Sequence, residues 1–327
     1  MALQTAFTRR FGVAHPIVQA GMRGVSPELV ATVCEAGALG TLPGSGVTPD
    51  AFDANIARLR VLTSRPFSVN LMTFPWADHW EQNLEVALRS RPASVTLSFG
   101  DPIPWLERFK AAGIASIVQV QEVAGARASL AGGADAIIVQ GNEGGGHTGR
   151  RGTLSFAAQV LEMAGATPVL VAGGVANGRG LAAALAMGAN GVVMGTRFKA
   201  TEEFAASIEH KQAILESDGS NTYYDAVMDV ARGGRWPNGV AGRVIRNEFT
   251  EEWAGREGEL EAEVGRLADP LAWIARYGTT PERQLNWAGE ASGLIHELLP
   301  SGEVVRRTVA EAEGYLAAAG RLVSPPP

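Results

Sequence analysis

The stretches Pro168-Val169-Leu170-Val171-Ala172-Gly173-Gly174 and Gly191-Val192-Val193-Met194-Gly195-Thr196 decide the fold. Each is a short, almost wholly apolar run rich in β-branched residues, which is the pattern of a parallel strand buried on both faces. Residues 178–187, between the two runs, have the Ala and Leu content and the apolar spacing of a helix. A strand, a helix and a second strand in this order predict a parallel βαβ unit.

The same unit recurs along the first 200 residues. The apolar runs lie at residues 15–20, 38–42, 67–71, 94–98, 116–120, 136–140, 168–172 and 191–195. Glycine-containing phrases such as Ala36-Gly37-Ala38 precede several of them, as expected where a helix ends and feeds the next strand. Eight units favour an α/β fold of the closed (β/α)₈ TIM-barrel type, and a doubly wound open parallel sheet is the alternative.

The pattern changes after about Ala200. Residues 201–320 are more charged and richer in aromatic residues, and no clear linker separates them from the barrel. We expect a (β/α)₈ barrel over residues 1–200, a helical addition over 201–320 that packs on the barrel and is not independent, and a flexible tail at 321–327. The addition fits either a cap over the strand ends or an oligomer contact, such as that of a homodimer.

Composition excludes several classes of function. Hydrophobic residues make up 46% of the chain and charged residues 19%, which supports a large core and argues against disorder. The net charge is −6 without a Lys/Arg-rich block, so nucleic acid is not an expected partner. No apolar run reaches the roughly 18 residues of a membrane span, and Met1 to Gly12 lack a signal core. We therefore expect a cytoplasmic protein.

The single cysteine, Cys34, cannot form an intrachain disulfide. It lies in an apolar helical stretch and is interpreted as core packing rather than as a catalytic thiol. The sequence shows no His/Cys/carboxylate cluster at metal-ligand spacing, so we expect no metal.

The active site of a barrel lies at the carboxyl ends of its strands, and here those ends are polar or rich in glycine. Converging amides suit a flat heteroaromatic ligand, and the glycine pairs after the seventh and eighth runs allow backbone N–H groups to approach a phosphate. Solvated loop residues and plain tight turns are the alternatives. The residues concerned are Gln19, Ala20, Gly21, Met22, Asn70, Gln119, Gln140, Gly173, Gly174, Gly195 and Thr196.

His147 is the strongest candidate for proton transfer. It follows Gly144-Gly145-Gly146, on an expected loop beyond the sixth run, where three glycines allow the chain to pass close to a ligand. Imidazole serves as an acid, a base or a hydrogen-bond donor near neutral pH. A surface histidine is the alternative. His15 lies at the wrong end of a strand, and the others, His79, His210 and His296, lie in polar or helical stretches.

The motif around His147 resembles that of a known family. Gln140-Gly141-x-Glu143-x-Gly145-Gly146-His147-x-Gly149 is similar to the signature of nitronate monooxygenases, formerly called 2-nitropropane dioxygenases. Other stretches agree in order and spacing, so that the resemblance spans roughly residues 10 to 300. They are residues 16–22, 67–71, 172–180 with 194–198, and Trp287-Ala288-Gly289-Glu290 with Gly293-Leu294-Ile295.

The resemblance implies a noncovalent FMN in the barrel and assigns the catalytic histidine to His147. It implies that Trp287 and Glu290 lie near the substrate. Two positions depart from the family pattern, because Gly144 replaces the usual Ala and Glu290 replaces the common Gln; an ionised Glu290 close to an anionic nitronate would be unfavourable. The residues that should hold FMN are Ala20, Gly21, Met22, Asn70, Gln119, Gln140, Gly145, Gly146, Gly173, Gly174, Gly195 and Thr196.

Three hypotheses for function follow from the resemblance. The first is FMN-dependent oxidation of an alkyl nitronate, a small-molecule substrate, by O₂. The second is an NAD(P)H-dependent flavin reductase that acts on a quinone or an enoyl thioester, the only case in which NAD(P)H is a cofactor. The third is a flavin-binding protein without turnover, which the intact His147 loop disfavours.

Overall fold

The computed structural model describes residues 3–74, 78–234, 236, 239–266 and 283–322. Its main sheet has eight parallel strands, each connected to the next through a helix. All eight overlap the apolar runs predicted from the sequence, with the least overlap at β2, which shares only residues 41–42 with the run at 38–42. The strands are β1 (Ile17–Gln19), β2 (Thr41–Pro43), β3 (Ser68–Thr73), β4 (Ser94–Gly100), β5 (Ala115–Val120), β6 (Ala136–Gln140), β8 (Val169–Ala172) and β9 (Gly191–Met194).

The strands follow chain order around a nearly closed barrel. The barrel closes between β1 and the residues before β2, where the Gln19 amide donates to the Leu39 carbonyl (3.0 Å) and the Leu39 amide donates to the Ile17 carbonyl (2.9 Å). The TIM-barrel prediction is confirmed, and the open doubly wound alternative is wrong because its strands would not run in sequence order.

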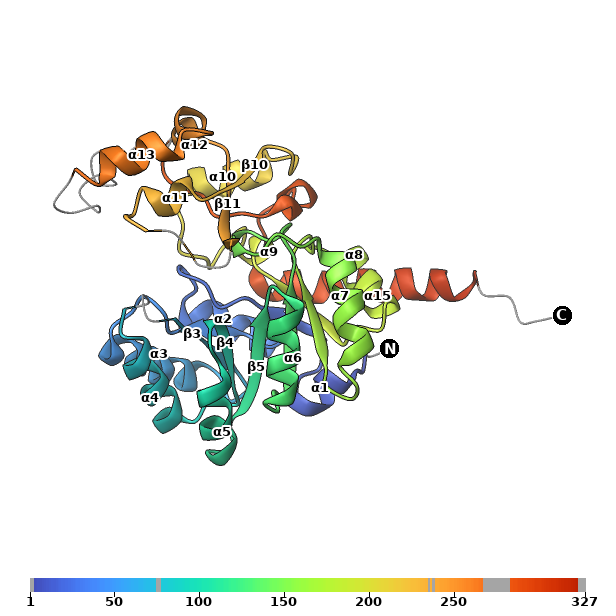
Figure 1. The fold of residues 1–327 in the computed structure, drawn as a ribbon. Helices are drawn as coiled ribbons and strands as arrows, with labels where there is room; N and C mark the ends of the chain where they lie inside the picture. The colour runs from blue at the N-terminus through green and yellow to red at the C-terminus, as the bar shows by residue number, and fades with distance from the viewer. Residues whose placement is uncertain (1–2, 75–77, 235, 237–238, 267–282, 323–327) are drawn as a thin grey trace.

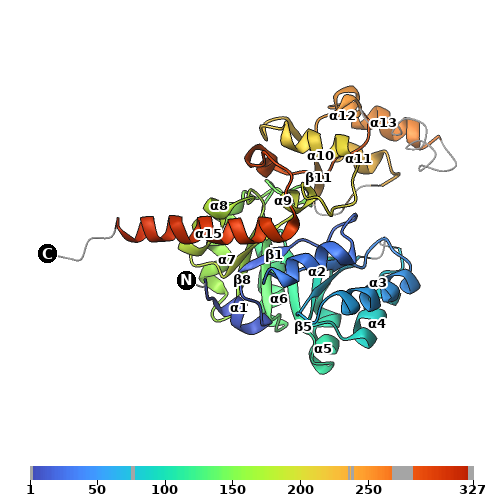
Figure 2. The same ribbon diagram turned by 180° about the vertical axis from the view of Figure 1, so that it is seen from behind.

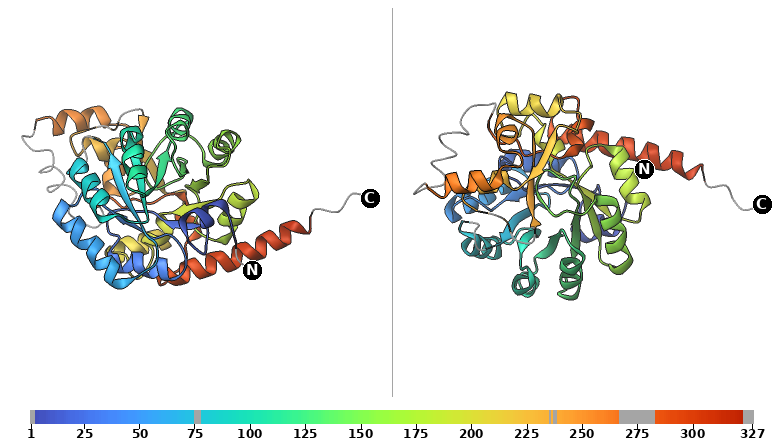
Figure 3. Two further views of the ribbon diagram at one scale, coloured as in Figure 1. Left: turned by 90° about the horizontal axis from the view of Figure 1, so that it is seen from below. Right: turned by 45° about the horizontal axis from the view of Figure 1, so that its top comes forward.

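Helices surround the strands, as Figure 3 shows. Several begin at side-chain caps, such as those of Ser26 and Thr48, each followed by proline in the first turn. The barrel helices are α2 (Pro27–Glu35), α3 (Pro49–Leu62), α4 (Trp80–Ser90), α5 (Ile103–Ala111), α6 (Val123–Ala131), α7 (Thr153–Met163), α8 (Gly178–Ala186) and the short α9 (Thr196–Lys199).

The amino-terminal end of the barrel is closed by α1 (Ala6–Phe11). Phe7 and Phe11 are buried in the cluster that includes the interior residues Val18, Ile138 and Leu170. The Thr5 hydroxyl, at the start of α1, donates to the carbonyl of Asn190 directly before β9 (2.7 Å). Because α1 closes the amino-terminal end, the carboxyl ends of the strands form the end of the barrel that is open to ligands.

A cap lies over those carboxyl ends (Figure 1). It has an apolar cluster of its own, which includes Val227, Met228, Val244, Phe249 and Trp253. The elements that form the cap are α10 (Ile208–Leu215), β10 (Thr222–Asp225), α11 (Val227–Val230), β11 (Ala241–Ile245), α12 (Glu248–Trp253), α13 (Glu257–Val264) and the 3₁₀ helix η2 (Glu290–Leu294).

The cap is not wholly helical, in contrast to the expectation for residues 201–320. Strands β10 and β11 form an antiparallel sheet with β7 (Gly146–Thr148), which comes from the barrel. These strands are too short for an alternating pattern to be recognised in the sequence.

The last helix, α15 (Ser301–Gly320), belongs to the barrel rather than to the cap. It packs along α8 and contacts α2 (Figure 2). Within α8, Gly178 permits this approach, because a Cβ there would lie 2.3 Å from Glu311 Cβ and 2.5 Å from the Ala312 nitrogen. Residues 323–327 of the expected tail lie outside the described residues.

Cys34 is buried in α2, and burial raises the pKa of its thiol to about 12. A neutral thiol packed in an apolar core is inert, which agrees with the interpretation as core packing. Among the described residues, no helix combines the length and apolarity that a membrane crossing requires.

The α8–α15 contact generates a prediction about stability. Gly178→Ala should lower the free energy of unfolding by about 1–3 kcal/mol, because the added methyl group overpacks the contact. Gly314→Ala on α15 is the matched control; a Cβ there meets no atom within 4 Å, and alanine should add about 0.5–1 kcal/mol of helix stability. Denaturant unfolding of both variants measures this, and equal stabilities would contradict it.

Candidate active site

The loop after β1 is held by β3 and β9. The Ala20 amide donates to the Met194 carbonyl (3.0 Å), and Asn70 Nδ2 donates to the Gly21 carbonyl (2.8 Å). A Cβ on Gly21 would lie 2.5 Å from Asn70 Cβ, so glycine allows this close contact. Asn70 therefore positions the loop, in addition to any ligand contact that it makes.

The predicted amides converge at the ends of β5 and β6. Gln119 Nε2 donates to Gln140 Oε1 (2.8 Å), and Gln121 Nε2 donates to the same oxygen (2.9 Å). Gln121 was not predicted from the sequence, although it follows the fifth apolar run by one residue. Two donors on one oxygen fix the orientation of the Gln140 carboxamide.

Two glycine turns lie after β8 and β9. Gly173 and Gly174 have φ values of 99° and 76°, which favour glycine. A Cβ on Gly174 would also lie 2.4 Å from Glu143 Oε2. At Gly195 a Cβ would meet only Ala20 Cβ (3.8 Å) and Met22 Sδ (3.9 Å), so there is room beside this residue.

The segment that begins at Trp287 packs against the glycine loop at residues 144–146. A Cβ on Gly145 would lie 2.6 Å from the Gly289 nitrogen, and the Gly289 amide donates to Thr196 Oγ1 (3.0 Å). The close approach at Gly145 is therefore to protein backbone. Gly146, with φ 75°, opens strand β7.

His147 lies on strand β7, not on the loop expected from its glycine-rich surroundings. It pairs with Gly242 of β11, so that the cap holds its backbone. Its Nε2 lies 2.8 Å from Oδ1 of Asp229, on α11. Asp229 is 5% exposed, and its Oδ2 is buried without a hydrogen-bond partner.

Aromatic rings surround His147. Trp236 stacks on the imidazole with centroids 4.3 Å apart, and Trp287 lies tilted at 4.9 Å. Phe99 contacts the Trp236 ring at 4.6 Å and Phe74 stacks on it at 5.2 Å. The site thus presents an apolar, aromatic wall next to one titratable ring.

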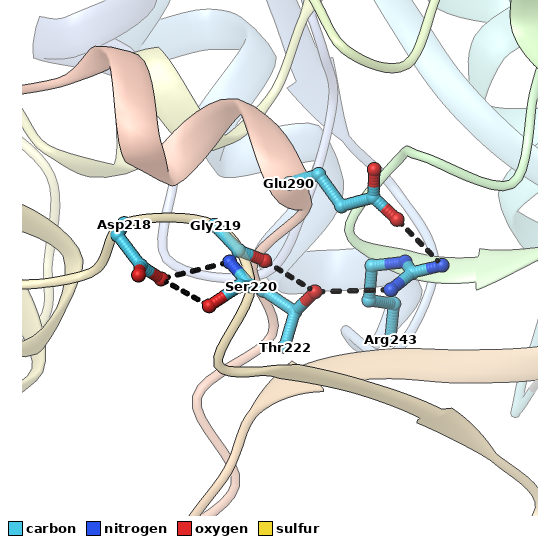
Figure 4. Close-up of a pocket in the computed structure, with 6 residues that line it drawn as sticks. All are labelled: Asp218, Gly219, Ser220, Thr222, Arg243 and Glu290. Carbon is cyan, nitrogen blue, oxygen red and sulfur yellow. Dashed lines mark hydrogen bonds and ion pairs between the residues drawn. The ribbon is translucent and has the colours of Figure 1, made fainter.

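The structure turns Glu290 toward Arg243. Glu290 Oε1 lies 3.1 Å from Arg243 Nη2, and Arg243 Nη1 donates to Thr222 Oγ1 (3.0 Å). Side chains alternate along β11, so Arg243 and His147, which pairs with Gly242, point to opposite faces of the small sheet. Figure 4 shows this ion pair at a pocket of about 480 Å³ lined by Asp218, Gly219, Ser220, Thr222, Arg243 and Glu290.

The sequence-based reasoning missed several residues of the site. Phe74 and Phe99 carried a usable signal, because both lie at the carboxyl end of a barrel strand. Phe74 directly follows β3, and Phe99 is the last residue but one of β4. Phe99 also has a positive φ of 55°, which is strained for a residue with a Cβ. Asp229 and Trp236 carried no local signal, because only the folding of the cap brings them to His147.

Lys199 anchors the segment that carries Trp287. Its Nζ donates to Asn286 Oδ1 (2.6 Å) and to the Trp287 carbonyl (3.1 Å). Burial lowers the pKa of this amine to about 8. The pKa of His210, which faces Lys199, is also lowered, first by burial and then by the charge of Lys199.

The shifted pKa of Lys199 predicts a pH dependence of stability. Between pH 8 and 10.5 the unfolded chain binds the proton and the folded chain releases it, so the free energy of unfolding rises with pH in this window. The free energy of unfolding of the native chain, minus that of Lys199→Met, should rise by on the order of 2 kcal/mol from pH 7.5 to 9.5. Lys110→Met, at an exposed position, is the control. A pH-independent difference for Lys199→Met would contradict the prediction.

Known proteins resemble this chain in both sequence and fold. The profile of the nitronate monooxygenase family matches residues 4–75 and 72–311. A nitronate monooxygenase of Pseudomonas aeruginosa is 31% identical over 355 residues, covering 94% of this chain and 99% of that protein. The solved structure of a nitroalkane oxidase from Streptomyces ansochromogenes has a TM-score of 0.81 at 31% identity, covering 96% of this chain and 100% of that chain.

A further relative carries a different name. The "(3aS,4S,5R,7aS)-5-hydroxy-7a-methyl-1-oxo-octahydro-1H-indene-4-carboxyl-CoA dehydrogenase" of Mycobacterium tuberculosis is 36% identical over 255 residues, covering 77% of this chain and 69% of that protein. Both relatives carry the names of oxidoreductases. From the extent of the profile match and the near-complete overlap with the Pseudomonas aeruginosa protein, the chain belongs to the nitronate monooxygenase family.

Proposed function

We propose that this protein is an FMN-dependent enzyme that oxidises alkyl nitronates with O₂, with His147 at the reacting centre. The observation that carries the proposal is the placement of His147, at the same end of the barrel as the two glycine turns and enclosed by aromatic rings. A titratable ring beside an apolar wall suits a small substrate that has a charged group and an alkyl body.

The residues at the strand ends fit a flavin phosphate and a planar ring. Gly173 and Gly174 form a turn whose backbone N–H groups are suited to a phosphate, and Gly195 has room beside it. Thr153 Oγ1, next to Gly173, is buried and has no hydrogen-bond partner. The Gln119–Gln140 pair offers carboxamides to the polar edge of a heteroaromatic ring. We propose that these groups, with Ala20, Gly21, Met22, Asn70, Gly145, Gly146 and Thr196, hold FMN.

Bound FMN would supply the redox chemistry, accepting electrons from the substrate and passing them to O₂. The side chains of this protein orient the substrate and handle its proton. A neutral nitroalkane must first lose the proton on the carbon that bears the nitro group. In our proposal the imidazole of His147 takes that proton, and the electron pair of the broken C–H bond moves onto the nitro oxygens.

The charge balance of the site suits an anionic nitronate. Glu290, whose charge would oppose such a substrate, is paired with Arg243 on the other face of the small sheet. Arg232 lies over the Trp287 ring, with its guanidinium carbon 5.3 Å from the ring centroid; the Asp229 carboxylate attracts it and the Arg23 guanidinium repels it, so two cations face one carboxylate here. Two guanidinium groups near the aromatic wall would stabilise a negative charge there.

An oxidoreductase acting on an acyl-CoA thioester is the second candidate. The Mycobacterium tuberculosis relative is named for a bicyclic carboxyl-CoA substrate, and the aromatic wall would also fit a flat ring system. NAD(P)H is a proposed cofactor only in the reductase form of this candidate. Oxidation of NADH or NADPH by the purified protein, with a quinone or an enoyl thioester as acceptor, separates this candidate from the first.

The protein should purify with noncovalent FMN, and Gly174→Val should weaken FMN binding. The valine would need a strained positive φ and would clash with Glu143, which distorts the phosphate turn. Heat should release FMN, and titration of the apoprotein with FMN measures the dissociation constant. Gly188→Ala is the control for backbone strain, because Gly188 also has a positive φ (94°) but no atom near its Cβ position. Unchanged affinity in Gly174→Val would place the phosphate elsewhere.

His147→Asn should lose about 10²–10⁴-fold in kcat/KM on a neutral nitroalkane, if one is accepted, as expected for removal of a general base. It should lose much less on the pre-formed nitronate, whose proton is already gone, and it should still bind FMN. His296→Asn, at an exposed position, is the control. Equal losses on the two substrate forms would make His147 a binding group instead of a base. Activity on neither form, together with rapid NAD(P)H oxidation, would favour the second candidate.

A further inference from the structure

Asp229 is the buried acidic partner of His147. Its Oδ1 lies 2.8 Å from His147 Nε2, and the two residues are 82 positions apart in the chain. The side chains of His147 and Asp229 are only 16% and 6% exposed. Burying a carboxylate costs free energy, and leaving Oδ2 without a partner adds to that cost. A residue placed at such a cost next to the proposed base calls for an explanation beyond packing.

The bond defines which nitrogen of the imidazole carries the proton. A carboxylate oxygen is an acceptor, so Nε2 must carry a hydrogen for the 2.8 Å contact to be a hydrogen bond. In the neutral ring the other nitrogen, Nδ1, is then an unprotonated acceptor. No described residue donates a hydrogen bond to Nδ1 in the structure.

The surroundings also fix the plane of the ring. Trp236 stacks on it with an interplanar angle of 27°, Trp287 lies at 38°, and Phe99 meets it edge-on at 89°. With rings packed about the imidazole and Nε2 engaged by Asp229, Nδ1 is the polar atom left for a substrate. Arg232, on the turn after α11, interacts electrostatically with Asp229 and partly offsets its charge.

We propose that Asp229 is a positioning residue that holds His147 in the tautomer protonated on Nε2, which makes Nδ1 the atom that takes the substrate proton. The rate consequences rest on the proposed function of His147 as a base, whereas the tautomer itself does not. The competing explanation is that Asp229 only fastens α11 of the cap to β7 of the barrel.

The first measurement reads the tautomer without turnover. In ¹⁵N-histidine-labelled protein with FMN bound, two-bond ¹H–¹⁵N correlations distinguish the two neutral tautomers. The chain has five histidines, and the His147 signals are those lost in His147→Asn. At a pH where the shifts show a neutral ring, we expect the proton on Nε2. A neutral ring protonated on Nδ1 in the native chain would overturn the proposal.

The second measurement compares Asp229→Asn with Asp229→Glu. Asparagine keeps the size but loses the carboxylate, so kcat/KM on a neutral nitroalkane should fall roughly 10- to 100-fold, by analogy with carboxylates that orient histidine ligands. The loss on the pre-formed nitronate should be much smaller. Asp229→Glu restores the carboxylate and should recover part of the activity. Equal losses in both variants, or equal losses on both substrate forms, would overturn the proposal.

Tyr224→Phe is the control for a purely structural role. Tyr224 Oη donates to the Thr148 carbonyl (2.8 Å) and so ties β10 of the cap to β7 without contacting His147. This variant should lose about 1 kcal/mol of stability with the tautomer and the ratio of the two substrate activities unchanged. If Tyr224→Phe changes that ratio as Asp229→Asn does, loosening the cap alone accounts for the loss of activity, and the positioning role of Asp229 is overturned. If the native chain turns over neither substrate form, the proposed function fails, and the tautomer measurement still decides the role of Asp229.

Discussion

The antiparallel pairing of β7 with β11 is the interaction on which the site depends. Strand β7 follows barrel strand β6 after the loop at residues 141–145, and β11 comes from the middle of the cap, so their hydrogen bonds attach the cap to the rim of the barrel. His147 lies within this pairing. The same contact therefore holds the backbone of the proposed base and brings Asp229, Trp236 and Trp287 around its ring.

The alternation of side chains along this small sheet separates two electrostatic environments. One face carries His147 against aromatic rings, and the other carries Arg243, paired with Glu290 beside a polar pocket. An acidic side chain that seemed unfavourable next to an anionic substrate is compensated within the protein. Glycine at position 242 is part of this arrangement, because a Cβ there would lie 2.3 Å from the Trp287 ring.

Much of the fold could be predicted because its signals are local. Each barrel strand lies in or overlaps an apolar run; the run at 136–140 is β6, and the run at 168–172 contains β8. The glycine turns at Gly173–Gly174 and the amide pair Gln119–Gln140 were also visible, since residues at the ends of parallel strands meet at one end of a barrel. The short strands of the cap and the position of α15 were not visible, because both depend on partners distant in the chain.

The sequence by itself determined the (β/α)₈ architecture, and it indicated that polar and glycine-rich residues, His147 among them, gather at the carboxyl ends of the strands. Periodicity and strand-end composition are properties of contiguous residues, so both can be read from the chain alone. Only the tertiary structure decided what surrounds that histidine. Asp229 lies 82 residues away, and its carboxylate reaches the imidazole only because the cap folds back over the strand ends and buries both groups. Long-range contacts of this kind arise from packing and desolvation, which leave no spacing or motif in the chain to read.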